Sequence, residues 1–506
     1  MSIGHDPAVA SRRAPWLDPL LVGAVALLVA LAGAWIPSYW SDEATTLRAV
    51  RLPLPELLDF VARRDAIHTA YYLWLHAWTS LVGEGELATR LPSAVAVALG
   101  AVGVFVLGRM LTTRRTAVLG AVAFAVLPRI TLEATEARPY ALTAAFAVWL
   151  TIALLVASRR HRRRWWVLYG VGLAASIWFF VPLGLLVLVH GTFLALAPAQ
   201  RRRRGARHRL LGWGISTALG LLAATPMIAR VLTERARLLT VADPSTGDAV
   251  TWWTVLVEPW FATSATVAVV AAGLLIVLGT RLRDRARTPG SLVLLGALWV
   301  VLPTGALLLL GLVAGPVYVP RLLTFVAPGM ALLLGAALST GRRRWVGIAL
   351  TVLLVVASAP TYVLQRTPTA KGGGSDLDRV AAYVEQQARP GDAFYLDAQG
   401  TVSTRPRQAL YAYPDAFEGL DDVALLRSGP PEGTFTDRTL SVEDPAEAQL
   451  LEERLADHDR LWVVRLASDE LTGTDLERLR ADGYAVAQEH ATGRCIVYLL
   501  VRRAPA

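Results

Sequence analysis

The chain has 506 residues, of which 54% are hydrophobic and only 18% are charged, and its mean hydropathy is +0.45. This composition excludes an ordinary soluble enzyme and predicts a polytopic membrane protein. The single cysteine, Cys495, excludes an intramolecular disulfide and a metal cluster held by cysteines.

The net charge of +10 does not indicate nucleic-acid binding, because two parts of the chain carry opposite charge. From Lys371 onward there are 15 basic and 24 acidic residues, which leaves 35 basic and 16 acidic residues before it. The basic residues of the first part gather between apolar spans, at Arg109, Arg114 and Arg115, and at 159–164, 201–209, 281–287 and 342–344. Such clusters are typical of cytoplasmic loops.

With these clusters on the inside, we expect about eleven transmembrane helices, with the N-terminus in the cytoplasm and the C-terminus outside the cell membrane. The apolar spans lie at 17–36, 93–111, 117–131, 140–157, 166–178, 182–197, 210–229, 262–280, 291–313, 322–340 and 345–363. No small-residue cleavage site follows the first span, so we expect it to remain as a helix and not to be removed as a signal peptide.

A long first external loop, 37–92, opens with the acidic pair Asp42-Glu43. Ionised side chains at a membrane boundary are costly, and they are functional candidates by default. The alternative is that Asp42 only caps a helix that starts at Ala44.

Later in the same loop, the segment 69–82 is apolar but short, and it is rich in tyrosine and tryptophan. A membrane span here would place the basic cluster around Arg109 on the outside. We therefore expect an interfacial helix that lies within the external loop.

Two further external segments concentrate charge. The loop at 133–139 holds Glu133, Glu136 and Arg138, for which a salt bridge at a helix start is the simpler explanation. Tyr318 precedes Arg321, a lone arginine on the outer side of a span, where snorkelling to a lipid headgroup is the alternative to a functional role.

The glycine-rich segment 367–375 is typical of a flexible linker, here between a membrane domain at 1–366 and a soluble domain at 376–506. The soluble domain is predicted to be α/β, with helices from 376, at 446–455 and at 475–481, and strands at 393–396, 461–466 and over 484–501. It contains no glycine-rich nucleotide loop, and we expect it to be a docking or acceptor-positioning module.

The charged residues of the external face suit one kind of chemistry, the transfer of a sugar from a lipid phosphate to a hydroxyl group. A hydroxyl is a poor nucleophile until a carboxylate takes its proton. The departing phosphate gains negative charge, which a planar guanidinium group stabilises with two parallel hydrogen bonds. A carboxylate on one side of the sugar and an arginine on the other are therefore expected.

Several motifs together resemble the protein O-mannosyltransferase-like and aminoarabinose-transferase-like membrane glycosyltransferases of the GT-C fold (glycosyltransferase family 39-like). The resemblance covers most of residues 17–340. Its motifs are Asp42-Glu43, Asp65-Ala66-Ile67-His68, Tyr71-Tyr72, Arg90-Leu91-Pro92-Ser93, Glu136-Ala137-Arg138-Pro139-Tyr140 and Arg321-Leu322-Leu323.

The resemblance implies a polyprenyl-phosphate-sugar donor, an inverting transfer to a glycan, lipid or protein acceptor, and an active site between the first external loop and the membrane. By motif, Asp42 is the catalytic base and Glu43 its partner, while Arg138 and Arg321 bind the donor phosphate. Further donor or acceptor contacts are expected from Glu136, His68, Tyr72 and Tyr318. Mannose is the sugar that family prevalence favours.

The chain departs from the family pattern at His68-Thr69-Ala70-Tyr71, where many members have His-Pro-Pro-Leu-Tyr and hence a more rigid loop. It keeps the charged residues of the second loop in Thr135-Glu136-Ala137-Arg138. No histidine and aspartate spacing predicts a tight metal site, although Asp42 and Glu136 could share a loosely held divalent cation. Metal dependence is left open.

Two other classes of protein share these features. A lipid-sugar flippase or transporter is expected to place its polar residues on broken helices at mid-membrane, not at the outer loops. A scaffold that binds a lipid-linked sugar without catalysis would need Arg138 and Arg321 but not Asp42. The loop position of Asp42 favours the enzyme.

Overall fold

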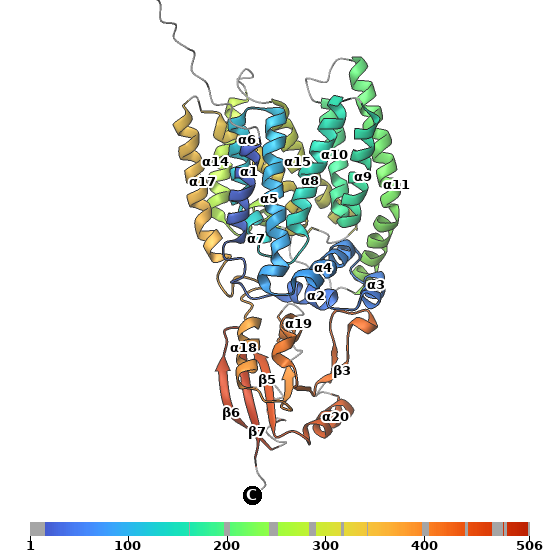
Figure 1. Ribbon diagram of the computed structural model, residues 1–506, viewed down its shortest axis with the longest axis vertical. Coiled ribbons are helices and arrows are strands. Elements are labelled where there is room, and N and C mark those ends of the chain that lie inside the picture. The colour runs from blue at the N-terminus through green and yellow to red at the C-terminus, as the bar shows by residue number, and fades with distance from the viewer. Residues whose placement is uncertain are drawn as a thin grey trace, which may run out of the picture.

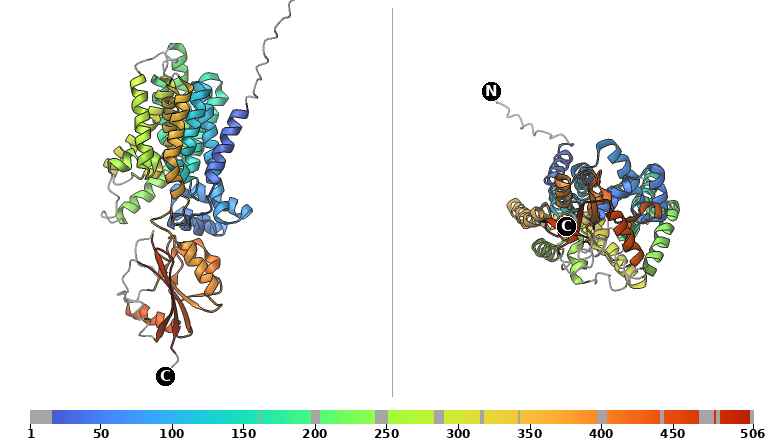
Figure 2. Two further views of the ribbon diagram at one scale, coloured as in Figure 1. Left: turned by 90° about the vertical axis from the view of Figure 1, so that its left-hand side faces the viewer. Right: turned by 90° about the horizontal axis from the view of Figure 1, so that it is seen from below.

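A computed structural model of the chain describes residues 16–160, 162–196, 203–241, 251–282, 290–314, 318–341, 343–396, 404–440, 444–467, 479 and 483–503. An upright bundle of long helices lies above a smaller domain built on a β-sheet (Figure 1). The turned views of Figure 2 show that the sheet domain lies below the bundle and not beside it. The fold is thus the expected helical membrane domain with a C-terminal α/β domain.

Each predicted span coincides with a helix of the bundle in the part of the chain that the structure describes. These helices are α1 (Leu17–Leu31), α5 (Glu86–Leu111), α6 (Arg114–Val126), α8 (Tyr140–Arg160), α9 (Arg163–Phe179), α10 (Leu186–Leu196), α11 (Arg203–Val241), α14 (Ala265–Arg281), α15 (Gly290–Ala314), α16 (Ala327–Ser339) and α17 (Arg344–Leu364). Among the described residues, 6 helical segments are long and apolar enough to cross a membrane, at 86–111, 140–160, 207–234, 290–313, 320–339 and 344–364. The count of eleven spans stays a prediction.

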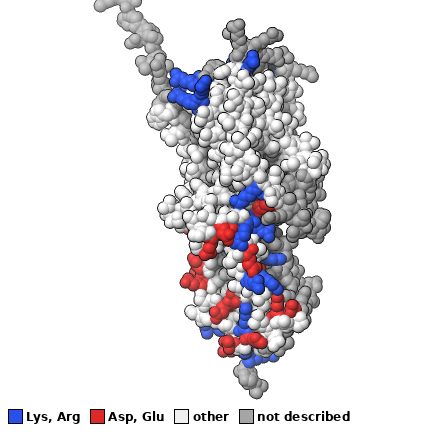
Figure 3. Space-filling view, turned by 90° about the vertical axis from the view of Figure 1, so that its right-hand side faces the viewer, with Lys and Arg blue, Asp and Glu red and all other residues white. Residues whose placement is uncertain are grey.

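The distribution of charge gives the bundle two distinct ends. Figure 3 shows a band of uncharged residues between a group of basic residues at the upper end and the charged surface of the sheet domain below. Helix α8 links these ends, because it starts at Tyr140, beside Arg138, and has Arg159 and Arg160 in its last turn. Its 21 residues extend over about 30 Å, which matches the hydrocarbon thickness of a bilayer.

Three short helices lie at the lower end of the bundle, next to the sheet domain, rather than among the long helices (Figure 1). They are α2 (Ser41–Val50), α3 (Leu54–Arg63) and α4 (Thr69–Val82), with the 3-10 turn η1 (Ala66–His68) between the last two. The segment that we expect to be interfacial is α4. The predicted first external loop is therefore mostly helical and forms a platform of α2, α3 and α4.

Further short segments complete this end of the bundle. They are α7 (Pro128–Glu133), η2 (Val181–Leu185), α12 (Trp252–Leu256), α13 (Glu258–Phe261) and η5 (Pro320–Val326). Proline occupies one of the first two positions of α7, η2, α13 and η5, where its fixed φ angle favours the start of a helical turn. These turns bring Glu133 and Arg321 to the same end of the bundle as α2.

The C-terminal domain is a mixed sheet with the strand order β2-β1-β5-β7-β6, in which β1 runs parallel to β2 and β5 while β7 is antiparallel to β5 and β6. Its strands are β1 (Ala393–Leu396), β2 (Asp421–Asp422), β3 (Leu425–Arg427), β4 (Arg438–Thr439), β5 (Arg460–Leu466), β6 (Tyr484–Ala491) and β7 (Cys495–Arg502). Its helical segments are α18 (Leu377–Gln387), α19 (Gln408–Ala412), η6 (Pro414–Phe417), η7 (Pro430–Glu432) and α20 (Pro445–Leu455). The predicted helix at 475–481 lies outside the described residues except for Leu479.

Alternate residues of the strands pack on opposite faces of the sheet, as the side-chain period of a strand requires. Phe394, Trp462 and Val497 lie in one core with α18 and α19. Tyr395, Val463 and Tyr498 lie in a second core with α20. The sheet is therefore covered by helices on both faces.

The first of these cores extends into the platform, because Tyr39 and the α2 residues Ala44 and Leu47 belong to it. Polar contacts reinforce this packing: Arg48 forms an ion pair with Asp437, and the Arg51 guanidinium donates to the Ala412 carbonyl oxygen (3.2 Å). The platform and the sheet domain are thus docked through a shared apolar core and partly buried arginine contacts.

The segment 367–375 is packed into this junction, contrary to the expectation of a flexible linker. The side chains of Lys371 and Ser375 are buried, with exposed fractions of 3% and 1%. The Ser38 N–H donates to the Pro368 carbonyl oxygen (2.8 Å), and the Ser375 hydroxyl donates to the Tyr39 carbonyl oxygen (2.7 Å). The prediction was wrong because a glycine run indicates backbone freedom but carries no information about tertiary contacts.

The topology can be tested with two single cysteines in a Cys495→Ser background. We expect an impermeant maleimide to label Arg427→Cys, on the surface of the sheet domain, in intact cells, and to label Arg162→Cys, at the start of α9, only after lysis. Both arginines are exposed, so accessibility depends on the side of the membrane alone. Labelling of position 162 but not of position 427 in intact cells would show that the orientation is the reverse of the predicted one.

Candidate active site

Asp42 lies in the first turn of α2, at the surface between the bundle and the sheet domain. Its Oδ2 atom accepts a hydrogen bond from Arg321 Nη1 (2.7 Å), and Arg138 Nη2 lies 3.9 Å from the same oxygen. The side chains of Asp42 and Arg321 are 25% and 35% exposed. The structure therefore brings together the predicted base and both predicted phosphate ligands, from three distant parts of the chain.

Aromatic rings frame the Arg321 guanidinium. Its carbon lies 5.6 Å from the ring centre of Trp40 and 5.8 Å from that of Tyr140. Contacts of this kind hold a guanidinium group in place and leave its N–H groups, which lie in the plane of the guanidinium, available for hydrogen bonds. Arg321 is thus fixed in position without being enclosed.

Arg138 is buried, with an exposed fraction of only 6%. It donates to the Thr46 hydroxyl (2.9 Å) and to the backbone oxygen of Asp42 (3.4 Å), and thereby connects the loop before α8 to α2. Its Nε atom has no hydrogen-bond partner among the described residues. The two predicted phosphate ligands are therefore different, since Arg321 is accessible and Arg138 is part of the site wall.

His68 connects Arg138 to Asp65. His68 Nε2 lies 3.3 Å from Arg138 Nη2, and His68 Nδ1 lies 2.7 Å from Asp65 Oδ1. A guanidinium group can only donate, so Nε2 is the acceptor and Nδ1 carries the proton that is donated to Asp65. Burial and the nearby Arg138 lower the pKa of His68 and outweigh the opposing effect of Asp65. The imidazole is therefore neutral.

The Asp65 carboxylate also accepts a hydrogen bond from the Tyr72 hydroxyl. The backbone of Asp65 has a φ angle of 54°, a left-handed conformation that aspartate tolerates better than most residues. Burial alone would raise the pKa of Asp65, but the hydrogen bonds from His68 and Tyr72 and the charge of Arg138 lower it. Asp65 is therefore ionised, and it fixes His68 and Tyr72 behind Arg138.

Glu43, the neighbour of Asp42 in sequence, has no exposed surface. Its Oε1 accepts from Arg90 Nε (2.9 Å) and the Ala137 N–H (2.8 Å), and its Oε2 accepts from Arg90 Nη2 (2.9 Å) and Lys371 Nζ (3.0 Å). Burial alone would raise the pKa of Glu43, but Arg90 and Lys371 outweigh it and hold the pKa at about 2. Both oxygens are thus engaged by the protein and neither faces solvent.

Glu136 lies in the loop between α7 and α8, 6% exposed. Burial, and then the nearby Glu133, raise the pKa of Glu136 to about 8. The Ser93 hydroxyl holds this loop by donating to the Glu136 backbone oxygen (2.6 Å). Glu136 is therefore an acid that stays protonated at neutral pH.

Tyr318 is the predicted site residue that the structure connects least with the others. Its hydroxyl donates to the Thr254 backbone oxygen (3.1 Å). Among the described residues it has no polar contact with Asp42, Arg138 or Arg321. Nor do the described residues contain a group of three or more His, Cys, Asp and Glu side chains suited to a metal ion.

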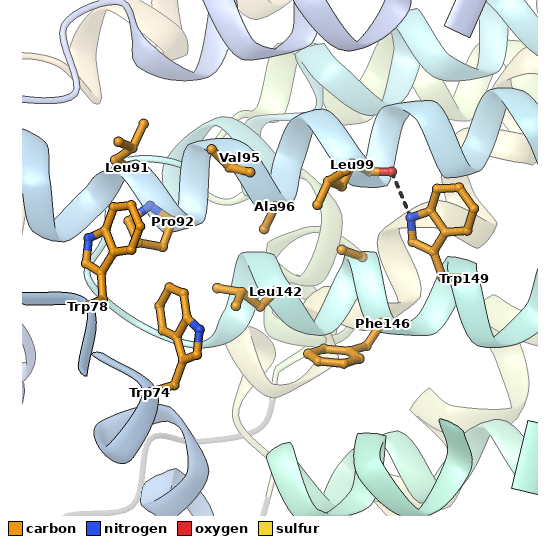
Figure 4. A pocket seen from close by; sticks show the side chains of 11 residues that line it. Trp74, Trp78, Leu91, Pro92, Val95, Ala96, Leu99, Leu142, Phe146 and Trp149 are labelled. Atoms are coloured by element: carbon orange, nitrogen blue, oxygen red, sulfur yellow. Dashed lines mark hydrogen bonds between the residues drawn. The ribbon is translucent and has the colours of Figure 1, made fainter. Parts of the chain in front are cut away.

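An apolar groove of about 370 Å³ lies between α4, α5 and α8 (Figure 4). Trp74 and Trp78 line its end next to the platform, and Leu99 and Trp149 line it deeper along the bundle. Both Leu99 and Trp149 are more than 40% exposed, so the groove opens on the outer surface of the bundle, where lipid lies. Pro92, in its wall, directly precedes Ser93, which holds the Glu136 loop.

Two charged residues of the site were given no role by sequence reasoning. Arg90 carried a detectable signal, because an arginine within an apolar helix is costly unless it has a partner or a function. Lys371 carried none, since it stands in a glycine-rich segment. Together they supply most of the positive charge around Glu43.

Comparisons with known proteins show which family and which folds the chain resembles. Residues 67–229 match the family model described as dolichyl-phosphate-mannose-protein mannosyltransferase. No curated protein sequence matches the chain.

Two solved structures of ArnT from Cupriavidus metallidurans have a similar fold over nearly the whole chain. The one bound to undecaprenyl phosphate has a TM-score of 0.58 and 14% identity, and the match covers 96% of this chain and 98% of that one. The apo structure has a TM-score of 0.60 and 14% identity, with coverages of 96% and 97%. The chain therefore has the GT-C fold of a multi-pass membrane protein, and with the family match the expected resemblance to membrane glycosyltransferases is confirmed.

The raised pKa of Glu136 predicts a pH dependence of stability. The pKa is raised from 4.5 to about 8 on folding, so its contribution to stability is fully present below about 4.5 and is lost as the pH rises through about 8. We expect Glu136→Gln to flatten the decline of the melting temperature over this range, measured in detergent. Glu432→Gln, at an exposed acid, should keep the wild-type slope, and an unchanged slope in Glu136→Gln would contradict the assignment.

Proposed function

We propose that this protein transfers a sugar from a polyprenyl-phosphate-sugar to a hydroxyl group of an extracytoplasmic acceptor, with inversion, and that Asp42 is the general base. One observation carries the proposal: the accessible Asp42 carboxylate lies 2.7 Å from the accessible Arg321 guanidinium, at the end of the helix bundle next to the sheet domain. The neighbouring carboxylates of Glu43 and Asp65 are engaged by buried partners and cannot take this role.

The reaction needs both members of this pair. The acceptor oxygen forms a bond to the anomeric carbon while the bond from that carbon to the phosphate oxygen breaks. Asp42 takes the acceptor proton, and the phosphate leaves on its lipid as an anion. Attack from the face opposite the phosphate inverts the configuration at the anomeric carbon.

Arg321 is proposed to bind the donor phosphate. A phosphate offers oxygens that match the planar guanidinium fork, and it would replace the Asp42 carboxylate as the partner of Arg321. This exchange frees Asp42 to accept a proton. Arg138 adds positive charge from behind, and its unpartnered Nε leaves one buried donor for an anion.

Two observations support a lipid-linked donor. A protein of similar fold has been solved with undecaprenyl phosphate bound. In this chain the groove between α4, α5 and α8 has an apolar lining and opens on the lipid-facing surface, so it suits a hydrocarbon chain (Figure 4).

The remaining predicted residues take supporting places in the proposal. His68 contacts Arg138 directly, and Asp65 holds both His68 and Tyr72 behind it. Glu136 and Tyr318 are proposed to lie near the donor or acceptor without a defined contact. Mannose as the sugar, and a glycan, lipid or protein as the acceptor, stay proposals. The donor can be identified by incubating the purified protein with a panel of polyprenyl-phosphate sugars and measuring which of them loses its sugar.

Asp42→Asn is expected to lower the rate of transfer by roughly a hundredfold or more, because the amide cannot take the acceptor proton. Donor binding should be largely retained. The assay is the initial rate with the active donor, together with the shift in melting temperature caused by that donor. Asp59→Asn, at an exposed acid of α3, is the matched control, and a wild-type rate in Asp42→Asn would refute the assignment.

Arg321→Lys is expected to raise the KM for the donor, and Arg321→Ala to raise it further, since an ammonium group cannot reproduce the bidentate contact with phosphate. Arg138→Lys should in addition lower the melting temperature, because Arg138 is buried and joins the loop before α8 to α2. The measurement is the initial rate against donor concentration for folded variants, with Arg63→Lys on α3 as the control. If Arg321 only snorkels to lipid, Lys will substitute without a change in KM.

A further inference from the structure

Lys371 is the only lysine of the chain, in which the other 49 basic residues are arginines. It lies just beyond the last helix of the bundle, and its side chain is buried. Its ammonium group donates to Glu43 Oε2 (3.0 Å) and to the backbone oxygen of Thr135. A residue that precedes the sheet domain thus reaches the residue next to Asp42 and the loop that carries Glu136.

The position suits a lysine better than an arginine. The opposite side of the Glu43 carboxylate is already occupied by the Arg90 guanidinium. A compact ammonium group can point its donors at both Glu43 and Thr135, whereas a second planar fork would need more room in a fully buried space. Burial, and then Arg90, lower the pKa of Lys371 to about 8, against the opposing effect of Glu43.

The residues that follow Lys371 touch the residues that precede Asp42. Gly372 has a φ angle of 55°, and a Cβ atom there would lie 2.9 Å from Trp40 Cβ. Arg494, from the sheet domain, donates to the Gly372 carbonyl oxygen (2.8 Å). The Asp378 N–H donates to the Ser38 hydroxyl (3.1 Å), and the Tyr39 N–H donates to the Tyr413 hydroxyl (3.1 Å).

We propose that Lys371, supported by Gly372, is a positioning residue of the active site, through which the C-terminal domain holds the first turn of α2 and therefore Asp42. The proposal rests on the proposed function and deepens it, because it makes the sheet domain part of the catalytic unit. Lys371 acts through Glu43 and does not contact the substrate.

The first test does not require a transferase assay. Because Lys371 is the only lysine, an amine-selective acetylating reagent has Lys371 and the N-terminal amine as its main targets, and mass spectrometry of the peptide that contains Lys371 reports its modification separately. We expect Lys371 to be acetylated at least tenfold more slowly in the native protein than in the unfolded protein. Gly372→Asn should speed the native reaction, while Gly373→Asn should not, because the space around Gly373 is open although its φ angle is also positive.

The second test separates positioning from folding. Lys371→Met and Lys371→Arg are expected to lower kcat by roughly a hundredfold, the loss typical of a reacting group displaced by about 1 Å. The KM for the donor should stay within about twofold, because Arg321 is untouched. Gly372→Asn should likewise lower kcat and leave the KM for the donor nearly unchanged. Gly373→Asn should change neither kcat nor KM.

The outcomes distinguish this proposal from the proposed function. If the wild type transfers no sugar from any donor, the proposed function fails, while acetylation still reports whether Lys371 is inserted. If the wild type is active and a folded Lys371→Met variant keeps its kcat, the positioning role is overturned. Rapid acetylation of Lys371 in the native wild type would overturn the positioning role as well. If the Lys371 variants do not fold, the comparison of kcat between Gly372→Asn and Gly373→Asn decides whether the role holds.

Discussion

The arrangement of the site depends on one buried carboxylate. Glu43 has no exposed surface, and four N–H donors from α5, from the loop before α8 and from the segment after α17 converge on it. A buried carboxylate costs several kcal/mol unless its lone pairs are satisfied, so each of these segments is needed where it lies. The bundle, the loop before α8 and the segment that leads into the sheet domain are therefore joined at Glu43.

This constraint gives the two acids of the Asp42-Glu43 pair different tasks. Successive residues of a helix point about 100° apart, so two neighbours in the first turn of α2 cannot face the same environment. Glu43 points inward and is 0% exposed, whereas Asp42 is 25% exposed and meets Arg321. Fixing Glu43 from three sides therefore fixes Asp42 at the surface, where a substrate can reach it, without restraining the Asp42 carboxylate itself.

Sequence patterns could predict the features that depend on local composition. Hydropathy and arginine clusters predicted the spans, and the charged loops predicted that Asp42, Arg138 and Arg321 meet. The roles of Lys371 and Glu43 were out of reach, because a glycine run does not show that its lysine is buried and adjacent acids do not show which one faces inward. Both depend on tertiary contacts between distant segments, such as the Lys371–Glu43 pair, whose members are 328 residues apart.

The site combines buried ion pairs, such as Glu43 with Arg90, and an accessible one, Asp42 with Arg321. The buried pairs make the site rigid, and the accessible pair can change its partners. Breaking a buried pair such as Glu43 and Arg90 leaves an uncompensated charge and costs about 3–5 kcal/mol, so these groups cannot exchange partners during a reaction. An accessible pair is worth only about 0–1 kcal/mol, because water stabilises the separated charges. Arg321 and Asp42 form the accessible pair of the site, with exposed fractions of 35% and 25%. In the proposed reaction a phosphate can therefore take over Arg321 at little cost, and the Asp42 carboxylate that it displaces is then free to accept a proton, while the buried pairs keep their partners.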